Sequence, residues 1–345
     1  MANNDWQEYQ FIQGAVFNNE TIVSFGNMQN ELICTQHQNV ICDLSHLDLL
    51  EISGEDAVTF LQGQVTNDVR LLTNNNAHYT GYCSPKGRLL ALFLAYTQNN
   101  NLYLQLNHKL AEPIAKRLKM YVMRSKVNIQ NISNSTVRIG LSGNNIADLL
   151  APLFSEIPMI AFESASSDNG VLICMPNSGT PRYQIICNTE YAKLVWQALK
   201  KDCKPVGKAC WEWLEIQAGI PEVYIKTQEE FVPQMLNLDA LNAINYKKGC
   251  YTGQEIVART HYLGKIKRRT QLAHITSTIS PGLGDDVMNA NQQAIGKIVR
   301  CVPSIDEGFD VLVECRLENL ALADIYWNNI ALNIKPLPYN LDDSQ

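Results

Sequence analysis

The sequence predicts an α+β protein with more than one domain, and three observations support this prediction. The chain has 345 residues, and at about 150 residues per domain this length corresponds to two or three domains. Amphipathic helices and β-prone runs alternate until Gly264, and beyond it only short β-prone runs separated by turn residues remain. The composition, 46% hydrophobic and 18% charged, is typical of a chain that folds along its whole length.

The first part of the chain is predicted to form an α+β unit. Pro85 and Gly87 separate two β-prone runs, which indicates a hairpin, and Leu110, Ile114 and Leu118 recur on one face of a helix. The predicted elements are a strand over 48–53, a short helix over 56–61, hairpin strands over 79–83 and 88–96, a strand over 102–106 and a helix over 109–122.

A second α+β pattern follows, and an all-β region ends the chain. The second pattern comprises a strand over 137–141, a helix over 146–154, strands over 171–174 and 182–187, and a helix over 191–199, with an exposed loop over 163–170. A further helix runs from Trp211 to Gly219. The strands predicted over 270–275, 296–302, 309–315 and 330–334 suit a compact β-barrel or sandwich.

Charge and hydropathy exclude several functions. The 28 Lys and Arg residues against 34 Asp and Glu residues leave a net charge of -6, which argues against direct nucleic-acid binding. No apolar run approaches the ~20 residues that span a bilayer, and the N-terminus lacks a basic region followed by an apolar one. We therefore expect a cytoplasmic protein without membrane association, and we interpret the basic run 265–269 as an edge strand protected by cations.

The ten cysteines are expected to be reduced, and no metal site is expected. They are spread over the whole chain, no C-x-x-C pair occurs, and no histidines are spaced as metal ligands on a helix. Most of these cysteines are interpreted as small buried hydrophobic residues.

One segment concentrates the chemistry. Thr252 and Glu255 have the spacing of a capping box, which predicts a helix with Thr252 as its N-cap and with Tyr251 and Ile256 as a hydrophobic staple. Cys250 then lies just before the amino end of the helix. Unpaired amides there, worth roughly 0.3–1 kcal/mol to an anion, together with Lys248 on the same side of the chain, favour the thiolate.

For Cys250, Arg259 and Trp211 the sequence leaves two interpretations open, one functional and one structural. Cys250 is otherwise a small apolar residue in packing, with Lys248 solvated. Arg259 either binds an anionic ligand tail or is a surface charge. The indole of Trp211 either stacks on a planar heterocycle or belongs to the core.

The run KGCYTGQE-x-VAR, from Lys248 to Arg259, strongly resembles the signature of the YgfZ family, folate-binding proteins related to the glycine cleavage system T protein. Other segments resemble family landmarks and occur in family order, so the resemblance extends from about residue 45 to the C-terminus. These segments are Phe60–Val69, Ser84–Arg88, Ser125–Val127, Ala218–Pro221, Phe231–Gln234, Asn237–Leu238 and Ile334–Tyr339.

The resemblance implies three domains around a central cavity. A folate-binding α+β domain like that of the T protein is discontinuous and comprises residues 1–126 and 204–263. A ferredoxin-like α+β domain comprises residues 127–203, and a C-terminal β-barrel comprises residues 264–345. The implied cofactor is tetrahydrofolate or another folate.

The resemblance also implies an activity and a set of site residues. It predicts a monomeric folate-binding accessory protein for the assembly or repair of iron-sulfur enzymes, which supports tRNA methylthiolation indirectly. Its expected partners are folate and iron-sulfur enzymes or their assembly machinery. Cys250 is the implied functional centre, with Lys248 in support. Folate contacts are assigned to Trp211, Gln217, Tyr251, Arg259 and Leu47; Gln217 stands where many relatives have glutamate, and an aliphatic residue near Leu47 replaces a second tryptophan.

Two other functions remain open at this point. The first is a folate-dependent aminomethyltransferase or demethylase of the T-protein type, although the stretch from Gly87 to Ala91 lacks the carboxylate that assists aminomethyl transfer. The second is a non-catalytic adaptor with a vestigial folate pocket.

Overall fold

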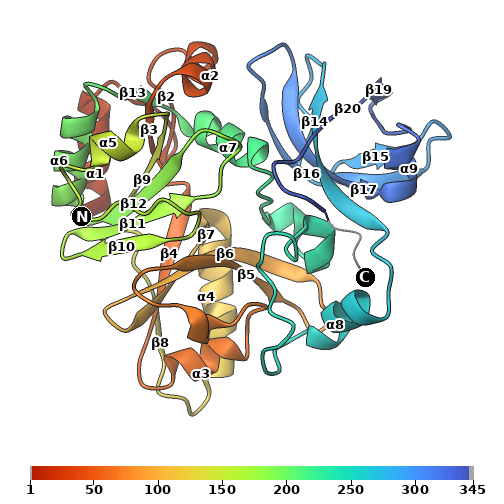
Figure 1. The fold of residues 1–345 in the computed structure, drawn as a ribbon, viewed down its shortest axis with the longest axis horizontal. Coiled ribbons are helices and arrows are strands. Elements are labelled where there is room, and N and C mark those ends of the chain that lie inside the picture. The colour runs from red at the N-terminus through yellow and green to blue at the C-terminus, as the bar shows by residue number, and fades with distance from the viewer. Residues whose placement is uncertain (1, 342–345) are drawn as a thin grey trace. The chain divides into compact units, whose positions relative to one another are not determined.

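The computed structural model describes residues 2–341, and the chain forms two compact units (Figure 1). Unit 1 comprises residues 1–58, 70–78 and 94–214, and unit 2 comprises residues 59–69, 79–93 and 215–345. Helix α3 (Ala57–Gln62), strands β5 (Ala77–Cys83) and β6 (Leu89–Gln98) and helix α7 (Lys208–Gln217) contribute residues to both. The boundaries of the three predicted domains stay a prediction. Within the described residues, no helix is both long and apolar enough to cross a bilayer.

Unit 1 contains a six-stranded sheet with strand order β10-β11-β12-β9-β3-β13. Its strands are antiparallel except for the parallel pair of β3 and β13. Every residue of β9, β11 and β12 is buried, including the polar side chains of Arg138, Arg182 and Gln184. The bounds are β3 (Val40–Asp43), β9 (Val137–Ser142), β10 (Ser164–Ser167), β11 (Gly170–Met175), β12 (Arg182–Cys187) and β13 (Lys204–Val206).

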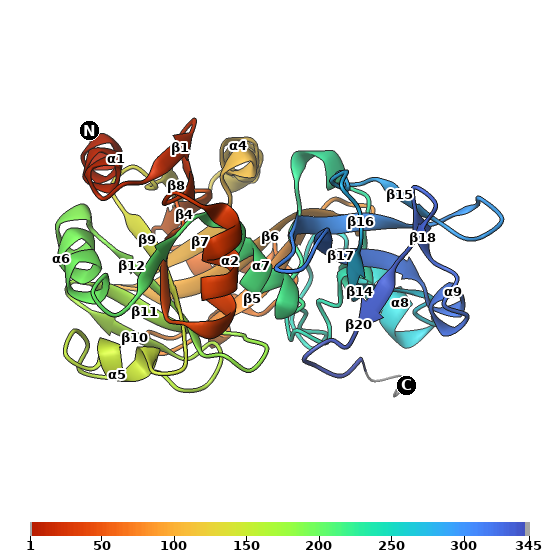
Figure 2. The ribbon, with the colours of Figure 1, turned by 90° about the horizontal axis from the view of Figure 1, so that it is seen from above.

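Helices cover this sheet, and the two outermost lie side by side (Figure 2). Trp6 of α1 (Ala2–Ile12) meets Trp196 of α6 (Thr189–Leu199) edge to face, with ring centroids 5.7 Å apart. The indole nitrogen of Trp6 donates to Asp43 of β3 over 2.8 Å. The other elements of this part of the chain are β1 (Val16–Asn18), β2 (Thr21–Ser24), α2 (Met28–His37) and α5 (Ile146–Leu150).

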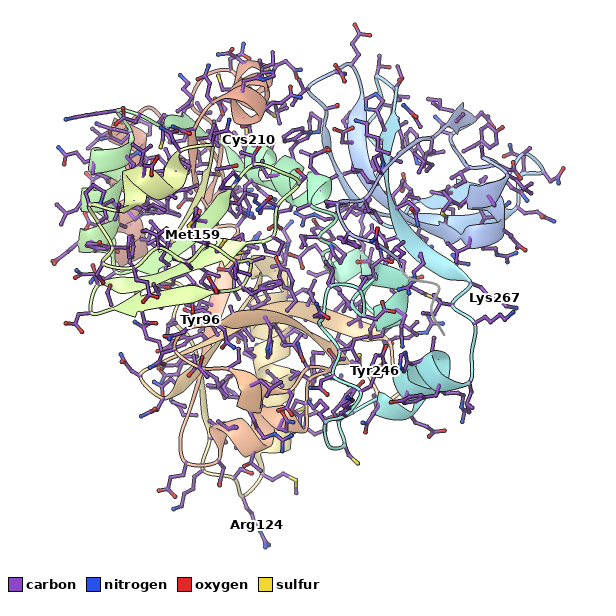
Figure 3. The ribbon with its side chains drawn as sticks, in the orientation of Figure 1. Tyr96, Arg124, Met159, Cys210, Tyr246 and Lys267 are labelled. Atoms are coloured by element: carbon purple, nitrogen blue, oxygen red, sulfur yellow. The ribbon has the colours of Figure 1, made fainter. Side chains whose placement is uncertain are left out.

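A second sheet has the strand order β5-β6-β7-β4-β8, and helix α4 packs on its unit 1 strands. The predicted apolar face of α4 is confirmed, because Leu110, Ile114 and Leu118 are buried. Figure 3 shows Arg124, just after α4, pointing away from the ribbon, whereas Tyr96 lies among packed side chains. The bounds are β4 (Leu47–Ser53), β7 (Asn101–Asn107), α4 (His108–Val122) and β8 (Asn128–Asn131), with the short helix η1 (Val69–Leu71) before β5.

Unit 2 is built on a seven-stranded sheet that curves into a nearly closed β-barrel (Figure 1). Its strand order is β19-β18-β15-β16-β17-β14-β20, and its interior is filled by residues such as Ile298, Val311 and Val313. The bounds are β14 (Arg268–Ile275), β15 (Asp286–Met288), β16 (Ala294–Pro303), β17 (Phe309–Arg316), α9 (Leu317–Ala321), β18 (Tyr326–Trp327), β19 (Ile330–Ala331) and β20 (Asn333–Lys335). The segment before the barrel contains η2 (Ile225–Thr227), η3 (Pro233–Leu236) and α8 (Gln254–Tyr262).

The mixed α and β composition predicted from the sequence is confirmed, with errors in single elements. The helix predicted over 146–154 ends at Leu150, and β13, β15 and α9 were not predicted. The predicted exposed loop over 163–170 is wrong, because residues 164–167 form β10, which pairs with β11 and buries Ser164 and Ala165. Polar side chains concealed the strand from sequence patterns, and cross-strand pairing decides its conformation. The sequence also assigned no elements to the first 44 residues, which form α1, α2 and strands β1 to β3.

Candidate functional site

The helix after Cys250 begins one residue later than predicted, and the predicted capping box is wrong. Helix α8 starts at Gln254, its N-cap is Gly253 with φ 84°, and no side chain caps it. A Cβ atom on Gly253 would lie 2.5 Å from the Ser84 carbonyl oxygen. The close approach of the Ser84–Gly87 turn therefore imposes a left-handed glycine at this position. Thr252 is consequently outside the cap, and Tyr251 and Ile256 lose the staple positions assigned to them.

Lys248 points into the interior of unit 2, where its ammonium group is surrounded by main-chain oxygens. Its Nζ donates to the carbonyl oxygens of Gln62, Val65 and Asn67 over 2.8, 2.5 and 2.8 Å. The side chain is 6% exposed. Hydrogen bonds from a charged donor are stronger than neutral ones, so this contact ties the Cys250 segment to the 62–67 segment. The support of the Cys250 thiol by Lys248 stays a prediction.

All ten cysteines lie within the described residues, and Cys250 is the exposed one. Eight of the others are buried, and Cys301 is intermediate. Burial raises the pKa of the Cys83 thiol to about 12 and the pKa of Cys315 to about 12. The prediction that most cysteines are small buried residues is thus confirmed, and the packed-in-the-core interpretation of Cys250 is excluded. An exposed thiol is the one available to a reagent or partner.

Tyr251 follows Cys250 directly, and its side chain is buried. It is 8% exposed, its ring lies 5.1 Å from the Lys248 ammonium, and burial raises the pKa of its phenol. A ring face beside a cation is a favourable arrangement. Tyr251 is therefore part of the base that holds Lys248 and Cys250 in place.

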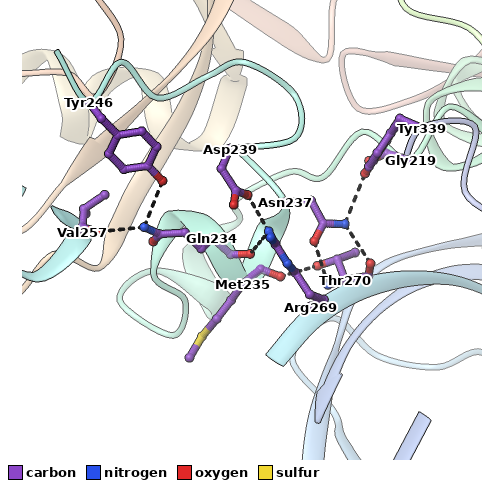
Figure 4. A network of polar contacts seen from close by, with 10 residues as sticks. All are labelled: Gly219, Gln234, Met235, Asn237, Asp239, Tyr246, Val257, Arg269, Thr270 and Tyr339. Atoms are coloured by element: carbon purple, nitrogen blue, oxygen red, sulfur yellow. Dashed lines mark hydrogen bonds and ion pairs between the residues drawn. The ribbon is translucent and has the colours of Figure 1, made fainter. Parts of the chain in front are cut away.

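A polar network links helix α8 to the barrel (Figure 4). Gln234 donates through Nε2 to the Val257 carbonyl of α8 over 2.7 Å and to the Tyr246 hydroxyl over 3.2 Å. Asn237 donates to the Thr270 carbonyl of β14 over 2.8 Å. Because Gln234 and Asn237 are fully buried, the Gln234 bond to Val257 constrains the position of α8 and the Asn237 bond constrains that of β14.

The C-terminal segment closes the same network. The Tyr339 hydroxyl donates to the Gly219 carbonyl over 2.8 Å and accepts from Asn237 over 3.3 Å. Arg269 donates to the Gln234 carbonyl over 3.1 Å and forms an ion pair with Asp239. The segments 231–234, 237–238 and 334–339, noted in the sequence only as landmarks, thus share one structural task.

Gln217, at the end of α7, is engaged within unit 2. Its Nε2 donates to Asp310 Oδ2 over 3.0 Å. The other oxygen of Asp310 contacts His274 Nδ1 at 2.9 Å and Lys335 Nζ at 3.0 Å. One of the two N–H donors of the Gln217 amide is therefore already used by Asp310, and its carbonyl oxygen is available to serve a ligand.

In unit 1, Trp211 is a core residue and Leu47 is buried. Trp211 is 1% exposed, the Arg182 guanidinium lies 4.3 Å from its ring, and a Cβ on Gly140 would come within 2.5 Å of it. Such contacts leave no free ring face for stacking. The indole Nε1 is buried without a hydrogen-bond partner, so a ligand would satisfy this donor rather than stack on the ring.

Arg259 lies on the exposed side of α8. It pairs with Glu255, four residues earlier on the same helix, and the side chains are 61% and 79% exposed. This arrangement agrees with the surface-charge interpretation, and a role toward a ligand tail stays a prediction. Within residues 2–341 there is no group of three or more His, Cys, Asp or Glu side chains placed to hold a metal ion.

The structure thus brings Lys248, Cys250 and Tyr251 together at the start of α8. Sequence reasoning missed the three carbonyl oxygens around Lys248, because main-chain atoms leave no trace in residue identity. It also missed the hydrogen bonds of Gln234 to Val257 and Tyr246; the only sequence signal was that Gln234 lies in a landmark segment.

Comparison with known proteins finds relatives over most of the chain. Residues 6–247 match the family described as the GCVT N-terminal domain. The tRNA-modifying protein YgfZ of Klebsiella pneumoniae (strain 342) is 31% identical over 303 residues, which cover 86% of this chain and 91% of that protein. The protein of the same name from Escherichia coli (strain SE11) is 30% identical over 302 residues, with the same coverage.

The chain belongs to the YgfZ family. Among solved structures, the glycine cleavage system aminomethyltransferase T from Bartonella henselae superimposes with a TM-score of 0.78 over 96% of each chain, at 16% identity. At that identity the likeness concerns the fold alone. This YgfZ-family chain therefore has the mixed α/β fold of a T protein, and the resemblance deduced from the signature is confirmed.

Proposed function

We propose that this YgfZ-family protein is a folate-binding accessory factor for the assembly or repair of iron-sulfur enzymes, with Cys250 as its functional thiol. Through those enzymes it supports tRNA modification by methylthiolation. The proposal keeps the three domains deduced from the sequence and their central cavity, and it places the protein in the cytoplasm as a monomer. The names of the relatives, tRNA-modifying protein YgfZ, support the link to tRNA.

The observation that carries the proposal is the placement of Cys250. An exposed sulfur stands on a segment that is held by the buried Lys248 ammonium and docked against the Ser84–Gly87 turn. Eight other cysteines are buried. Most thiols of this chain are buried, whereas the Cys250 thiol is exposed on a segment fixed by hydrogen bonds. This placement suits thiol chemistry with a partner.

Folate is supported by the T-protein-like fold and by one unsatisfied group. The Trp211 indole Nε1 is buried and has no acceptor, and a pterin or a glutamyl tail offers several. We assign the folate contact to this donor, with the Gln217 carbonyl oxygen, Tyr251, Arg259 and Leu47 as the further contacts deduced from the resemblance.

The thiol is tested by replacement with a matched control. Cys250→Ser and Cys301→Ser both remove a sulfur outside the fully buried core. We expect Cys301→Ser to restore tRNA methylthiolation in cells that lack the protein and Cys250→Ser to fail, with equal amounts of folded protein. Full restoration by Cys250→Ser would refute the role of the thiol.

The folate contact is tested by calorimetric titration with tetrahydrofolate. Trp211→Phe keeps an aromatic ring and removes the N–H; Trp196→Phe does the same at another buried indole without a hydrogen-bond partner. We expect about a tenfold lower affinity for Trp211→Phe only, which corresponds to about 1.4 kcal/mol. No heat with the unaltered protein would favour the adaptor, whereas formaldehyde release from an N-methyl donor would favour the T-protein-type enzyme.

A further inference from the structure

Two large apolar side chains stand in solvent at the end of α8. Tyr262, the last residue of the helix, is 63% exposed, and Leu263 is 84% exposed. Lys265 and Lys267 follow on the same exposed segment. We call these residues, Tyr262, Leu263, Lys265 and Lys267, the α8 end surface. Isolated exposed apolar residues are ordinary, but adjacent ones beside cations have the composition of a contact surface.

The base beneath this surface is ordered. The Tyr246 and His261 rings stack with centroids 3.7 Å apart, and the Tyr262 ring meets His261 edge to face at 4.6 Å. The Leu263 amide donates to the Arg259 carbonyl over 3.0 Å and ends the helix. A partner therefore meets side chains that are already positioned, which lowers the entropy lost on binding.

In the basic run 265–269 the two arginines form ion pairs and the two lysines are exposed to solvent. Arg268 pairs with Glu314, and Arg269 pairs with Asp239. For Lys265 and Lys267 no ion pair is found within residues 2–341, and Figure 3 shows Lys267 directed away from the ribbon. The α8 end surface is thus a local positive site on a chain with net charge -6.

These charges and apolar groups fit a protein better than a nucleic acid. Two lysines release the counterions of about two phosphates, whereas nucleic-acid binders commonly use about 6–10 contacts. An aliphatic residue as exposed as Leu263 gains nothing from a phosphate backbone. An apolar spot on an acidic protein complements both features of the surface.

We propose that the α8 end surface is the docking site for an acidic protein partner. The inference rests on the proposed function, in which that partner is the iron-sulfur enzyme served by Cys250. The nine residues of α8 extend about 14 Å, and Cys250 precedes the helix by four residues. A partner held at one end of α8 is thereby kept near the thiol at the other end.

The test measures binding of the purified protein to a purified tRNA-methylthiolating iron-sulfur enzyme from the same organism. Leu263→Asp removes the apolar contact, and its control is Leu322→Asp, at an exposed leucine elsewhere in unit 2. The double variant Lys265→Glu with Lys267→Glu reverses the charge, and its control is Lys226→Glu, at an exposed lysine. Circular dichroism and a thermal melt verify that each variant is folded.

We expect Leu263→Asp and the double lysine variant to weaken binding at least tenfold, with the controls within twofold. The lysine variant also flattens the dependence of affinity on salt. The proposal is overturned if the unaltered protein does not bind at micromolar concentration, if Leu263→Asp binds within twofold, or if tRNA alone binds through the two lysines. The assay needs neither folate nor Cys250, so these outcomes are separate from failure of the proposed function, which Cys250→Ser reports.

Discussion

Replacing Lys248 by methionine tests whether a buried ammonium holds the Cys250 segment in place. Methionine keeps the length and the apolar stem of the side chain and removes the charge. Three carbonyl oxygens, of Gln62, Val65 and Asn67, lose their donor. A hydrogen bond to a charged group contributes about 1.5–3 kcal/mol, and the three bonds are not additive because they share one nitrogen.

The expected loss is about 3–5 kcal/mol in the free energy of unfolding of unit 2, because three buried carbonyl oxygens are left without this donor, each at about 1–3 kcal/mol and less than additively. This is a large part of the roughly 5–15 kcal/mol that stabilises an ordinary domain. Urea unfolding followed by fluorescence measures the loss. Hydrogen exchange locates it, since the Thr66 amide, which donates to the Gly81 carbonyl over 2.9 Å, should exchange faster in the variant.

The control is Lys247→Met, at the preceding and exposed lysine, which should change stability by less than about 0.5 kcal/mol. A Lys248→Met protein within about 1 kcal/mol of the unaltered one, with unchanged exchange at Thr66, would refute the role assigned to the buried ammonium. That result would also remove the reason given for the fixed position of Cys250.

Three other predictions follow from the same contacts. Iodoacetamide at pH 8 should modify Cys250 first, because it is exposed, whereas burial holds the pKa of Cys83 near 12; mass spectrometry showing prior modification at a buried thiol would contradict this. The contribution of the buried thiols to folding stability should be constant below about pH 8 and be lost progressively above it, because burial raises their pKa values and they keep their protons in the folded state while the unfolded chain loses them. Each such thiol contributes a slope of about 1.4 kcal/mol per pH unit, and alkaline denaturation midpoints measure it. Gly253→Ala should cost about 1–3 kcal/mol, because φ is 84° and a Cβ meets the Ser84 carbonyl at 2.5 Å, whereas Gly249→Ala meets nothing within 4 Å; equal melting temperatures for the two variants would show that the turn contact does not constrain the helix.

The sequence by itself determined the elements whose periodicity reflects burial on one side and the segment whose signature indicates the family. Helix α4 was predictable because Leu110, Ile114 and Leu118 repeat with the period of a helix facing a sheet. The hairpin of β5 and β6 was predictable from Pro85 and Gly87. The Lys248–Arg259 signature indicated the family, since residue identities in a fixed order are a property of the sequence alone.

The tertiary structure decided the features that depend on atoms distant along the chain. Three main-chain oxygens receive the Lys248 ammonium, and the Ser84–Gly87 turn makes Gly253 the N-cap of α8 instead of Thr252. Strand β10 has polar side chains and exists because β11 pairs with it. In each case the deciding partner is a backbone group brought close by folding, and a backbone group is the same for every residue, so no local pattern of side chains could have revealed it.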